Sequence, residues 1–355
     1  MTESVVKSDS PVTVLIAGIG GGSLGLEIFK SLRLTGAYRL VGSDVSPAAF
    51  GLHAQGFDRT YRLRRAPALE YAQQLLDICR QEGVEAVAPG ADATHKILVA
   101  HRKMFEDAGV LVTINSTPVI ELCSDKARSL DFLRQHGVPV PAVMAIESES
   151  DVGSFGRFPC VVKPGSDSGA SNMVFLAEDA DEARFFVRYI RRRGATALLQ
   201  EYIDSPHEFT VGVLCEPTGR VAGSVALRRS FDQKLSLALR YDDRVISSGW
   251  SQGLIDDFPQ VRSQAERIAS VLGSTWALNI QGRVGPDGNF YPFEINPRHS
   301  GTTYLRAMAG LNEPDLLLQA CLRGRAIRIG PIRPGYYLRA FTEEYVPLER
   351  ASAHD

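Results

Sequence analysis

Apolar segments alternate with helical patterns from the start of the chain to about residue 118. The apolar segments are short, and each ends in turn residues: TVLIAG, YRLVGSD, EAVAPG and VLVTIN. Patterns of helical period lie between them, as in PALEYAQQLLDICRQEG and DATHKILVAHRKMFEDAG. This alternation predicts a parallel sheet that is covered by helices on both faces.

The pattern changes after residue 118. A strand in FPCVVKP, a small polar loop at 164–172, a helix in EDADEARFFVRYIRRRG and a strand in ALLQEYI follow one another. From Glu208 onward strand patterns dominate, apart from a helix near 257–273. We therefore predict an α/β domain, a small α+β lobe and a larger β-rich lobe. The expected boundaries give a disordered tail at 1–11, the α/β domain at 12–118, the small lobe at 119–198 and the larger lobe at 199–355.

The most informative segment is a hairpin pattern, TWALNIQGRVGPDGNFYPFEINPR, at 275–298. The PDG triplet within it marks a tight turn. With the turn centred on Asp287 and Gly288, two polar pairs face each other across the hairpin. These pairs are Gln281 with Glu294 and Asn279 with Asn296. The two-residue period of strands places all four side chains on one face.

This face groups amides with a carboxylate, and Arg298 continues it if the chain stays extended. Val284 and Phe293 belong to the opposite face. Such a polar group is costly to bury unless it binds something polar or charged. Carboxylate and amide oxygens suit Mg²⁺, and an arginine beyond them suits the charge on a phosphoryl group in transfer. The alternative is a hairpin whose polar face meets solvent, as outward faces of antiparallel sheets commonly do.

Two lysines can be interpreted against a phosphate-bearing ligand. Lys163 ends a strand and enters the small polar loop, whose backbone N–H groups could surround phosphates. The alternative is a plain surface loop beside a solvated lysine. Lys126 begins a helix, where its charge opposes the helix dipole unless an anion binds there. The plainer interpretation is a single exposed lysine.

Two carboxylates lie where a nucleoside could bind. Glu201 ends the strand in LLQEYI, and the backbone near Ile203 could contact an adenine edge. An ordinary core strand with an exposed Glu is the alternative. Glu208 could accept hydrogen bonds from ribose hydroxyls, although taken alone it is most simply a surface carboxylate.

The composition excludes several classes of protein. The 355 residues are 44% hydrophobic and 23% charged, which is typical of a soluble enzyme with two or three domains. A net charge of −2 creates no field that favours nucleic acid or acidic membranes. No apolar stretch approaches the ~20 residues that span a bilayer. The five scattered cysteines form no CxxC pair, and no apolar core for export follows the N-terminus, so we expect a cytoplasmic protein.

Taken in order, these motifs resemble the ATP-grasp superfamily over residues 12 to 330. The motifs are SDKARSLDFL, FPCVVKPGSDSGASN, LLQEYIDSPHEFTVGV and LNIQGRVGPDGNFYPFEINPRHSGTT. EINPR after the NIQG strand is the most specific, and each of the others is weak alone. The similarity looks closest to the branch with carbamoyl-phosphate synthase halves and the amino-acid ligase of pyrrolysine synthesis. It implies an α/β plus α+β fold, with a Rossmann-like domain before a two-lobed ATP-grasp fold.

The resemblance also implies roles for individual residues. Those implied to contact ATP are Lys126, Lys163, Ser166, Ser168 and Gly169 of the small loop, Glu201, Ile203 through its backbone, and Glu208. Mg²⁺, with Mn²⁺ able to substitute, would be held by Gln281, Glu294 and Asn296. Catalytic roles are implied for Lys163 and for Arg298, which would stabilise an acyl phosphate. Many relatives have Asp or Glu where Gln281 stands, and His299 stands where a small or aromatic residue is common, so it would touch substrate or simply pack.

A glycine fingerprint near the start of the chain suggests a competing function. Gly20, Gly22 and Gly25 fit G-x-G-x-x-G, and Asp44 closes the next apolar run. This motif alone is a weak sign of dinucleotide binding. The resemblance implies a Rossmann-like domain that lines the site of a second substrate instead. We therefore interpret the fingerprint as a relic or a substrate-binding loop rather than an NAD site.

The leading functional hypothesis is an ATP-dependent carboxylate–amine ligase that works through an acyl phosphate. Its partners would be a small-molecule carboxylate and amine, with no nucleic acid or membrane, and the chain would be a candidate homodimer. Arginine matches a carboxylate bidentately, which makes the VALRRSF arginines candidates for substrate binding. The full set of substrate candidates is Arg228, Arg229, His299, Ser300 and Gly301. One or both arginines could equally lie on a wet strand surface.

Three other functions are weighed against this hypothesis. A carbamoyl-phosphate-type kinase acting on carbonate or carbamate is the second, although 355 residues hold one such unit without a glutaminase. An NAD-dependent oxidoreductase leaves the polar hairpin unexplained. A non-catalytic nucleotide sensor is disfavoured because the phosphate and metal positions look intact.

Overall fold

The N-terminal part of the computed structural model is a five-stranded sheet with helices on both faces. The structure describes residues 10–165, 173–232 and 234–347. The strand order is β3-β2-β1-β4-β5, with parallel pairing throughout. The strands are β1 (Val12–Ala17), β2 (Tyr38–Asp44), β3 (Arg59–Arg62), β4 (Ala86–Pro89) and β5 (Leu111–Val112). The helices are α1 (Leu24–Arg33), α2 (Phe50–His53), α3 (Ala68–Glu82), α4 (Asp92–Ala100) and α5 (Arg102–Glu106).

Both faces of this sheet are buried. In β1, Val14 and Ile16 pack with Ile28 of α1, whereas Leu15 packs with Leu75 of α3. A strand covered on both sides must be apolar on both sides, which is why β1 reads as a continuous apolar run. The prediction of an N-terminal α/β domain is confirmed.

The second sheet is small and antiparallel, in the order β6-β9-β7-β8. Its strands are β6 (Val143–Ile146), β7 (Cys160–Pro164), β8 (Phe175–Ala177) and β9 (Ala197–Glu201). Helix α9 (Ala180–Arg191) packs on it through Val187 and Ile190, which contact the cluster containing Cys160 and Leu199. The remaining helices of this region are α6 (Thr117–Ser124), α7 (Lys126–Gln135), the 3-10 turn η1 (Glu149–Asp151) and α8 (Val152–Phe155).

The third sheet has six strands in the order β16-β15-β10-β11-β14-β17. Its strands are β10 (Glu208–Cys215), β11 (Val221–Arg229), β14 (Gly253–Ile255), β15 (Ala277–Val284), β16 (Phe290–Asn296) and β17 (Gly335–Tyr337). Helix α10 (Pro259–Leu272) packs Ile268 against Val211 on one face. On the other face, α11 (Thr303–Ala309) and α12 (Glu313–Arg323) bring Leu305 and Leu317 against Leu214. A separate hairpin consists of β12 (Leu237–Tyr241) and β13 (Arg244–Ser247), after the 3-10 turn η2 (Lys234–Ser236).

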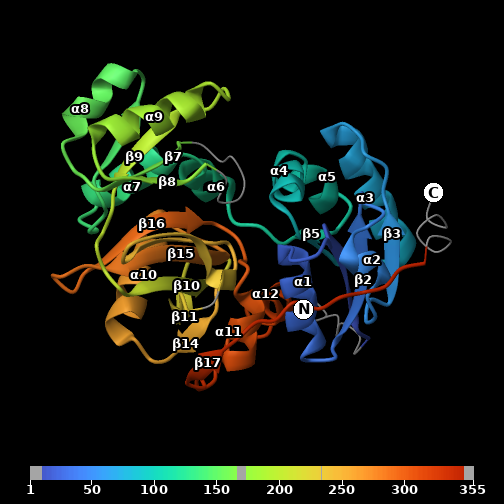
Figure 1. Ribbon diagram of the computed structural model, residues 1–355. Helices are drawn as coiled ribbons and strands as arrows, with labels where there is room; N and C mark the ends of the chain where they lie inside the picture. The colour runs from blue at the N-terminus through green and yellow to red at the C-terminus, as the bar shows by residue number, and fades with distance from the viewer. Residues whose placement is uncertain (1–9, 166–172, 233, 348–355) are drawn as a thin grey trace.

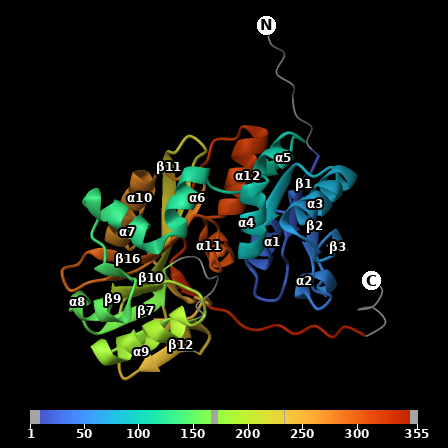
Figure 2. The same ribbon diagram turned by 90° about the horizontal axis from the view of Figure 1, so that it is seen from above.

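The N-terminal domain and the rest of the chain share an interface built around α1. Helices α11 and α12 both pack against α1. The C-terminal segment then runs back along the N-terminal domain, as Figures 1 and 2 show. Arg339 of that segment fixes the arrangement through an ion pair with Glu27 of α1 at 2.9 Å. The cavity described below lies where these parts meet.

Some details differ from the sequence-based expectations. The single helix predicted over 92–109 is interrupted at His101, which separates α4 from α5. The expected boundary at 198/199 falls inside β9, which pairs with β6 and β7. The domain boundaries themselves stay predictions. In the described part of the chain, no helix is long and apolar enough to cross a membrane.

Candidate active site

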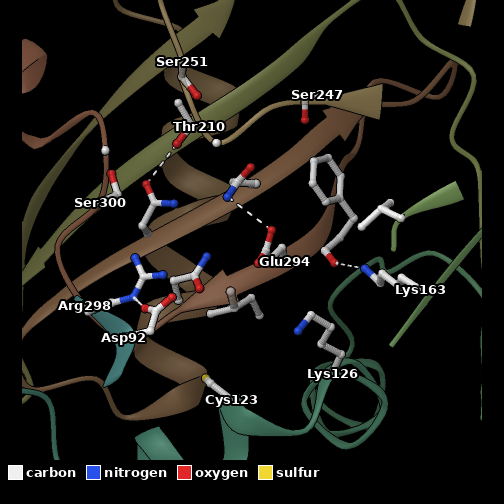
Figure 3. Close-up of a pocket in the computed structure, with 18 of the residues that line it drawn as sticks. Asp92, Cys123, Lys126, Lys163, Thr210, Ser247, Ser251, Glu294, Arg298 and Ser300 are labelled. Carbon is white, nitrogen blue, oxygen red and sulfur yellow. Dashed lines mark hydrogen bonds and ion pairs between the residues drawn. The ribbon is translucent and has the colours of Figure 1, made fainter. Parts of the chain in front are cut away.

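A cavity of about 680 Å³ opens between the three sheets. Its walls come from the N-terminal domain, the small sheet and the larger sheet, and Figure 3 shows side chains of these elements around one opening. Most of the sequence-predicted site residues line it. They are Lys126, Lys163, Glu201, Ile203, Glu208, Gln281, Glu294, Asn296, Arg298, Ser300 and Gly301.

The hairpin of β15 and β16 forms one wall of the cavity. Asn279 pairs with Asn296 and Gln281 pairs with Glu294, so both predicted pairs are confirmed. Gln281 donates from Nε2 to Glu294 Oε2 at 3.3 Å, which shows that the two side chains share a face. Nearer the turn the pairing is displaced by one residue from the predicted register, with Val284 opposite Phe290, and the predicted pairing begins at Gln281.

A bulge in β16 changes the surroundings of this face. The register shifts between Gln281 and Gly282, and Phe293 is left without a partner strand residue. Because one extra residue in a strand reverses the alternation of side chains, Phe293 lines the cavity. Its predicted position on the opposite face is wrong. Val284 does pack against the core, as expected.

The donor set on this face fits a hard divalent cation. Glu294 offers a carboxylate, and Gln281 and Asn296 offer amide oxygens, which are ligands that Mg²⁺ accepts. No group of three His, Cys, Asp or Glu side chains that could hold a metal exists among the described residues. A cation here would therefore need further oxygens from water or from phosphates, which is how Mg²⁺ is usually held.

Lys163 is buried at the cavity wall in β7. Its Nζ donates to Gln200 Oε1 at 2.8 Å and to the carbonyl oxygen of Phe293 at 3.0 Å. Burial, against the opposing charge of Glu294 and together with the charge of Lys126, lowers the pKa of Lys163 to about 8. A bound anion would favour the charged form, so this position suits a phosphate contact.

Lys126 lies at the start of α7 and faces the same opening. Asp125 caps this helix by accepting from the Arg128 N–H at 3.0 Å. The Lys126 N–H donates to the carbonyl of Gly165 at 3.2 Å, which ties the helix to the end of β7. Figure 3 shows the side chains of Lys126 and Lys163 on the same side of Glu294. The predicted ATP contacts Ser166, Ser168 and Gly169 lie outside the described residues.

The end of β9 forms another part of the wall. The Glu201 carboxylate accepts from the Ala142 N–H at 3.0 Å and from Arg157 at 3.1 Å. The Ile203 carbonyl accepts from Arg283 at 3.2 Å. Both residues line the cavity, and their contacts with adenine stay a prediction.

Glu208 is the centre of a buried ionic cluster rather than a surface carboxylate. It is 1% exposed, and its Oε2 accepts from Arg283 Nε and Nη2 at 3.1 and 2.9 Å. Its Oε1 lies 3.4 Å from Arg229 Nη1 and accepts no hydrogen bond within the described part of the chain. The ribose contact stays a prediction, and Oε1 is the atom on which it depends.

Neither arginine of VALRRSF lines the cavity. Arg228 lies over the ring of Phe258, at 5.6 Å from its centroid. Arg229 is enclosed and donates to the carbonyls of Ser236 and Ser248 at 3.1 and 2.7 Å. Successive residues of a strand point to opposite faces, and neither face here brings a guanidinium to the cavity. The geometry gives no support to the substrate role predicted for this pair.

Arg298 lies at the far end of the polar face and reaches across to the N-terminal domain. Its Nε is 3.0 Å from Asp92 Oδ1, at the start of α4, and its Nη1 donates to the carbonyl of His299 at 3.1 Å. Figure 3 shows Arg298 and Asp92 side by side. Arg298, which was predicted to be catalytic, is thus held by a residue of the N-terminal domain. The hairpin pattern gave no sign of this contact.

The residues after Arg298 separate into two groups. Ser300 and Gly301 line the cavity, and Ser300 Oγ accepts from Arg306 at 3.1 Å. His299 is buried behind them, with Nδ1 3.6 Å from Glu313 Oε2, and it does not line the cavity. Of the two roles considered for His299, packing is the one that this position supports.

The glycine fingerprint has a packing explanation. A Cβ at Gly25 would lie 2.1 Å from the carbonyl oxygen of Gly18, so only glycine allows α1 to approach β1. A Cβ at Gly22 would lie 2.1 Å from Trp250 Cζ2, which places the indole directly on the loop. Asp44 accepts from the backbone N–H groups of Ile19 and Ser46. Gly22 also lines the cavity, in keeping with the interpretation of this motif as a substrate-binding loop.

Sequence reasoning missed several cavity residues. Asp92 and His95 come from α4, and Thr210 of β10 donates to Asn279 at 2.9 Å. Thr210 was visible as a polar residue inside an apolar strand. Asp92 follows the carboxyl end of a parallel strand, where ligands of α/β folds usually bind. Both signals were present but weak.

Three family descriptions match successive parts of the chain. A PylC-like N-terminal domain matches residues 14–113, a RimK-like ATP-grasp domain matches 123–230, and an ATP-grasp domain "in the biosynthetic pathway with Ter operon" matches 194–344. Among curated proteins, the carbamoyl phosphate synthase large chain of Rubrobacter xylanophilus is 25% identical over 80% of this chain. The match spans only 27% of that relative's length.

Two solved enzyme structures are similar to this chain in fold. The biotin carboxylase domain of Hydrogenobacter thermophilus 2-oxoglutarate carboxylase superposes with a TM-score of 0.66, 19% identity, and 90% and 72% of the two chains covered. The L-amino acid ligase of Bacillus licheniformis superposes with a TM-score of 0.64 and 16% identity, and the match covers 92% of this chain and 78% of the ligase. At such identities the likeness shows the fold alone. The matches to the two ATP-grasp family descriptions, at 123–230 and 194–344, place this chain in the ATP-grasp superfamily.

Proposed function

We propose that this chain is an ATP-dependent ligase that joins a carboxylate to an amine through an acyl phosphate. One observation carries the proposal. The Gln281–Glu294–Asn296 face, two lysines and Arg298 line a single cavity between three parts of the chain. Phosphoryl transfer needs a bound divalent metal, cations that hold the phosphates and a further cation beside the transferring group. The residues of this cavity are of the types that supply all three.

The phosphates of ATP would lie between the lysines and the polar hairpin. Lys163 would donate to a phosphate oxygen from its fixed place beside Gln200, and Lys126 would add a second charge from the start of α7. Mg²⁺ held by the polar face would neutralise phosphate charge and orient the transferring group. Glu201, the Ile203 backbone and Glu208 would contact the nucleoside at the other end of the cavity.

Arg298 would act where charge develops. A substrate carboxylate attacks the γ-phosphorus of ATP, a new C–O–P linkage forms and ADP leaves. The guanidinium of Arg298 would stabilise the phosphoryl group during this transfer and then the acyl phosphate. The amine then attacks the acyl carbon and phosphate leaves. Ser300 and Gly301 would line the place where the acyl group sits.

A carbamoyl-phosphate-type reaction is the second candidate. The observation in its favour is the match to a carbamoyl phosphate synthase large chain over 80% of this chain. Release of ADP with bicarbonate and ammonia alone would support it, whereas release only with a carboxylate and an amine supports the ligase. A homodimer and a cytoplasmic location stay proposals.

The first experiment is a thermal stability measurement with nucleotides. A ligand that binds the folded state raises the melting temperature by mass action. MgATP is expected to raise it, and NAD(H) and NADP(H) are not, because Trp250 covers the glycine loop. The Glu294→Gln variant serves as the matched control and is expected to lose the Mg²⁺-dependent part of the shift. Stabilisation by a dinucleotide and none by MgATP would reverse the proposal.

A further inference from the structure

The start of α4 brings two polar side chains to the Arg298 end of the cavity. Asp92 is the first residue of the helix and its side chain is 43% exposed. His95, one turn later, is 9% exposed, lines the cavity, and its Nε2 has no hydrogen-bond partner within the described part of the chain. A ring nitrogen that is this deeply buried without a partner costs free energy unless a ligand satisfies it.

Asp92 differs from the other carboxylates of the cavity wall. Among the described lining residues, Glu201 and Glu208 are held by arginines near the nucleoside end, and Glu294 belongs to the proposed metal face. Asp92 lies at the opposite end, 3.0 Å from Arg298 Nε. It is therefore the carboxylate next to the place where the acyl phosphate would form.

We propose that Asp92 and His95 form the subsite that binds the amino group of the amine substrate. This inference rests on the ligase function proposed above and names the residues that recognise its second substrate. An ammonium group has three donors and needs acceptors, which the Asp92 carboxylate and the His95 Nε2 provide. An ammonium nitrogen has no lone pair, so it first gives up one proton to the Asp92 carboxylate or the neutral His95 ring; the free amine then attacks the acyl carbon beside Arg298, and phosphate leaves.

The protonation state of His95 supports its role as an acceptor. Burial, together with the charge of Arg298 and against the opposing charge of Asp92, lowers the pKa of His95 to about 4. The ring is thus neutral at neutral pH and one of its nitrogens can accept. Lys96, the exposed neighbour on the same helix, carries a charge that would not attract an ammonium group. Recognition here depends on the two acceptors rather than on net charge.

The ion pair between Asp92 and Arg298 also implies an order of binding. Without ligands, the two side chains satisfy each other. When an anionic acyl phosphate binds to Arg298, the Asp92 carboxylate becomes available to the ammonium group. The subsite is therefore expected to bind the amine more tightly once the acyl phosphate has formed.

The test compares two nucleophiles on the full-length protein. A productive pair of substrates is first found by offering amino acids singly and in pairs and measuring ADP release. Hydroxylamine then replaces the amine; because it is mostly uncharged at neutral pH, it traps the acyl phosphate without an ammonium group. Asp92→Asn is expected to raise the KM for the amine by about 10- to 100-fold, the equivalent of a lost charge-assisted hydrogen bond. Hydroxamate formation should change less than about threefold.

Matched variants keep the result interpretable. His95→Phe removes the acceptor and is expected to raise the amine KM, whereas His95→Asn retains an acceptor and should restore part of the affinity. Asp77→Asn removes an exposed aspartate on α3, 62% exposed, and should leave both reactions unchanged. Melting temperatures identify any variant that fails to fold.

The outcomes separate the subsite from the function on which it rests. If the wild-type protein forms no hydroxamate with any carboxylate, the proposed ligase function fails. If it does form hydroxamate and Asp92→Asn leaves the amine KM unchanged, the subsite is overturned while the ligase function stands. Equal losses with the amine and with hydroxylamine would also overturn the subsite, because Asp92 would then only position Arg298.

Discussion

Removing the carboxylate of Glu208 tests the buried ionic cluster most sharply. This side chain contacts two guanidinium groups, from Arg229 and Arg283, so the cluster carries one negative and two positive charges. Glu208→Gln keeps the shape but leaves two buried cations without the carboxylate that they share. Leaving a buried charge uncompensated costs about 3–5 kcal/mol. We expect a loss of unfolding free energy in that range.

Arg283→Met provides the comparison because it leaves a neutral pair of Glu208 with Arg229. The loss then consists of hydrogen bonds to Glu208 and to the carbonyls of Ile203 and Val245. Each bond from a charged donor contributes about 1.5–3 kcal/mol, and methionine recovers part of the summed loss by filling the space. Both variants are therefore expected to lose several kcal/mol, and Glu208→Gln does so although it changes almost no side-chain volume.

The assay is unfolding in urea, followed by far-UV circular dichroism and by tryptophan fluorescence to detect intermediates. Glu149→Gln is the control, because Glu149 forms an exposed ion pair with Arg188 and such pairs contribute little. A loss for Glu208→Gln no larger than that for the exposed control Glu149→Gln would refute the charge argument. It would also return Glu208 to the simpler role of a ribose contact, in which ATP affinity rather than stability would fall.

Three further predictions concern the proposed catalytic groups. Glu294→Gln should abolish ADP release with little loss of stability. Asn296→Ala and Gln281→Ala should only raise the Mg²⁺ concentration that the reaction requires. Near wild-type turnover of Glu294→Gln at low Mg²⁺ would refute the metal assignment. Arg298→Ala and Arg298→Lys should lower kcat, by about 10² or more for the alanine variant, with little change in ATP affinity; weaker ATP binding with intact kcat would make Arg298 a ground-state ligand. Phosphate charge should raise the pKa of Lys163 from about 8, so MgATP binding near pH 8 should take up about half a proton, falling to none at about pH 6 where the lysine is already charged. Calorimetry in buffers of different ionisation enthalpy measures this uptake, and an unchanged uptake in Lys163→Met would refute it.

The polar hairpin could be predicted because its information is local. The turn and the two-residue period indicated that Gln281 and Glu294 face each other, and they do, although the pairs nearer the turn are one residue away from the predicted register. The bulge at Phe293 was not predicted, because a glycine inside a strand, here Gly282 next to the shift, is only a weak sign of one. A strand pattern predicts which residues alternate only as long as the alternation is unbroken.

The ionic interior was harder to predict than the fold. Glu208 looked like a surface carboxylate because charged residues are usually exposed, yet it is 1% exposed. Its burial depends on Arg283, far along the chain, which approaches only when β10 and β15 pair. The same holds for Asp92 and Arg298, which come from different domains. Contacts between distant segments leave no periodic trace in the sequence.

The most direct test of the proposed ligase follows oxygen from the carboxylate substrate to phosphate. The protein is given MgATP, an amine and a carboxylate labelled with ¹⁸O, using a pair that releases ADP. An acyl phosphate intermediate transfers one labelled oxygen to the released phosphate, and mass spectrometry detects the labelled phosphate and the amide product. The account predicts both. Amide formation with unlabelled phosphate, or ADP release that requires only bicarbonate and ammonia, would contradict it.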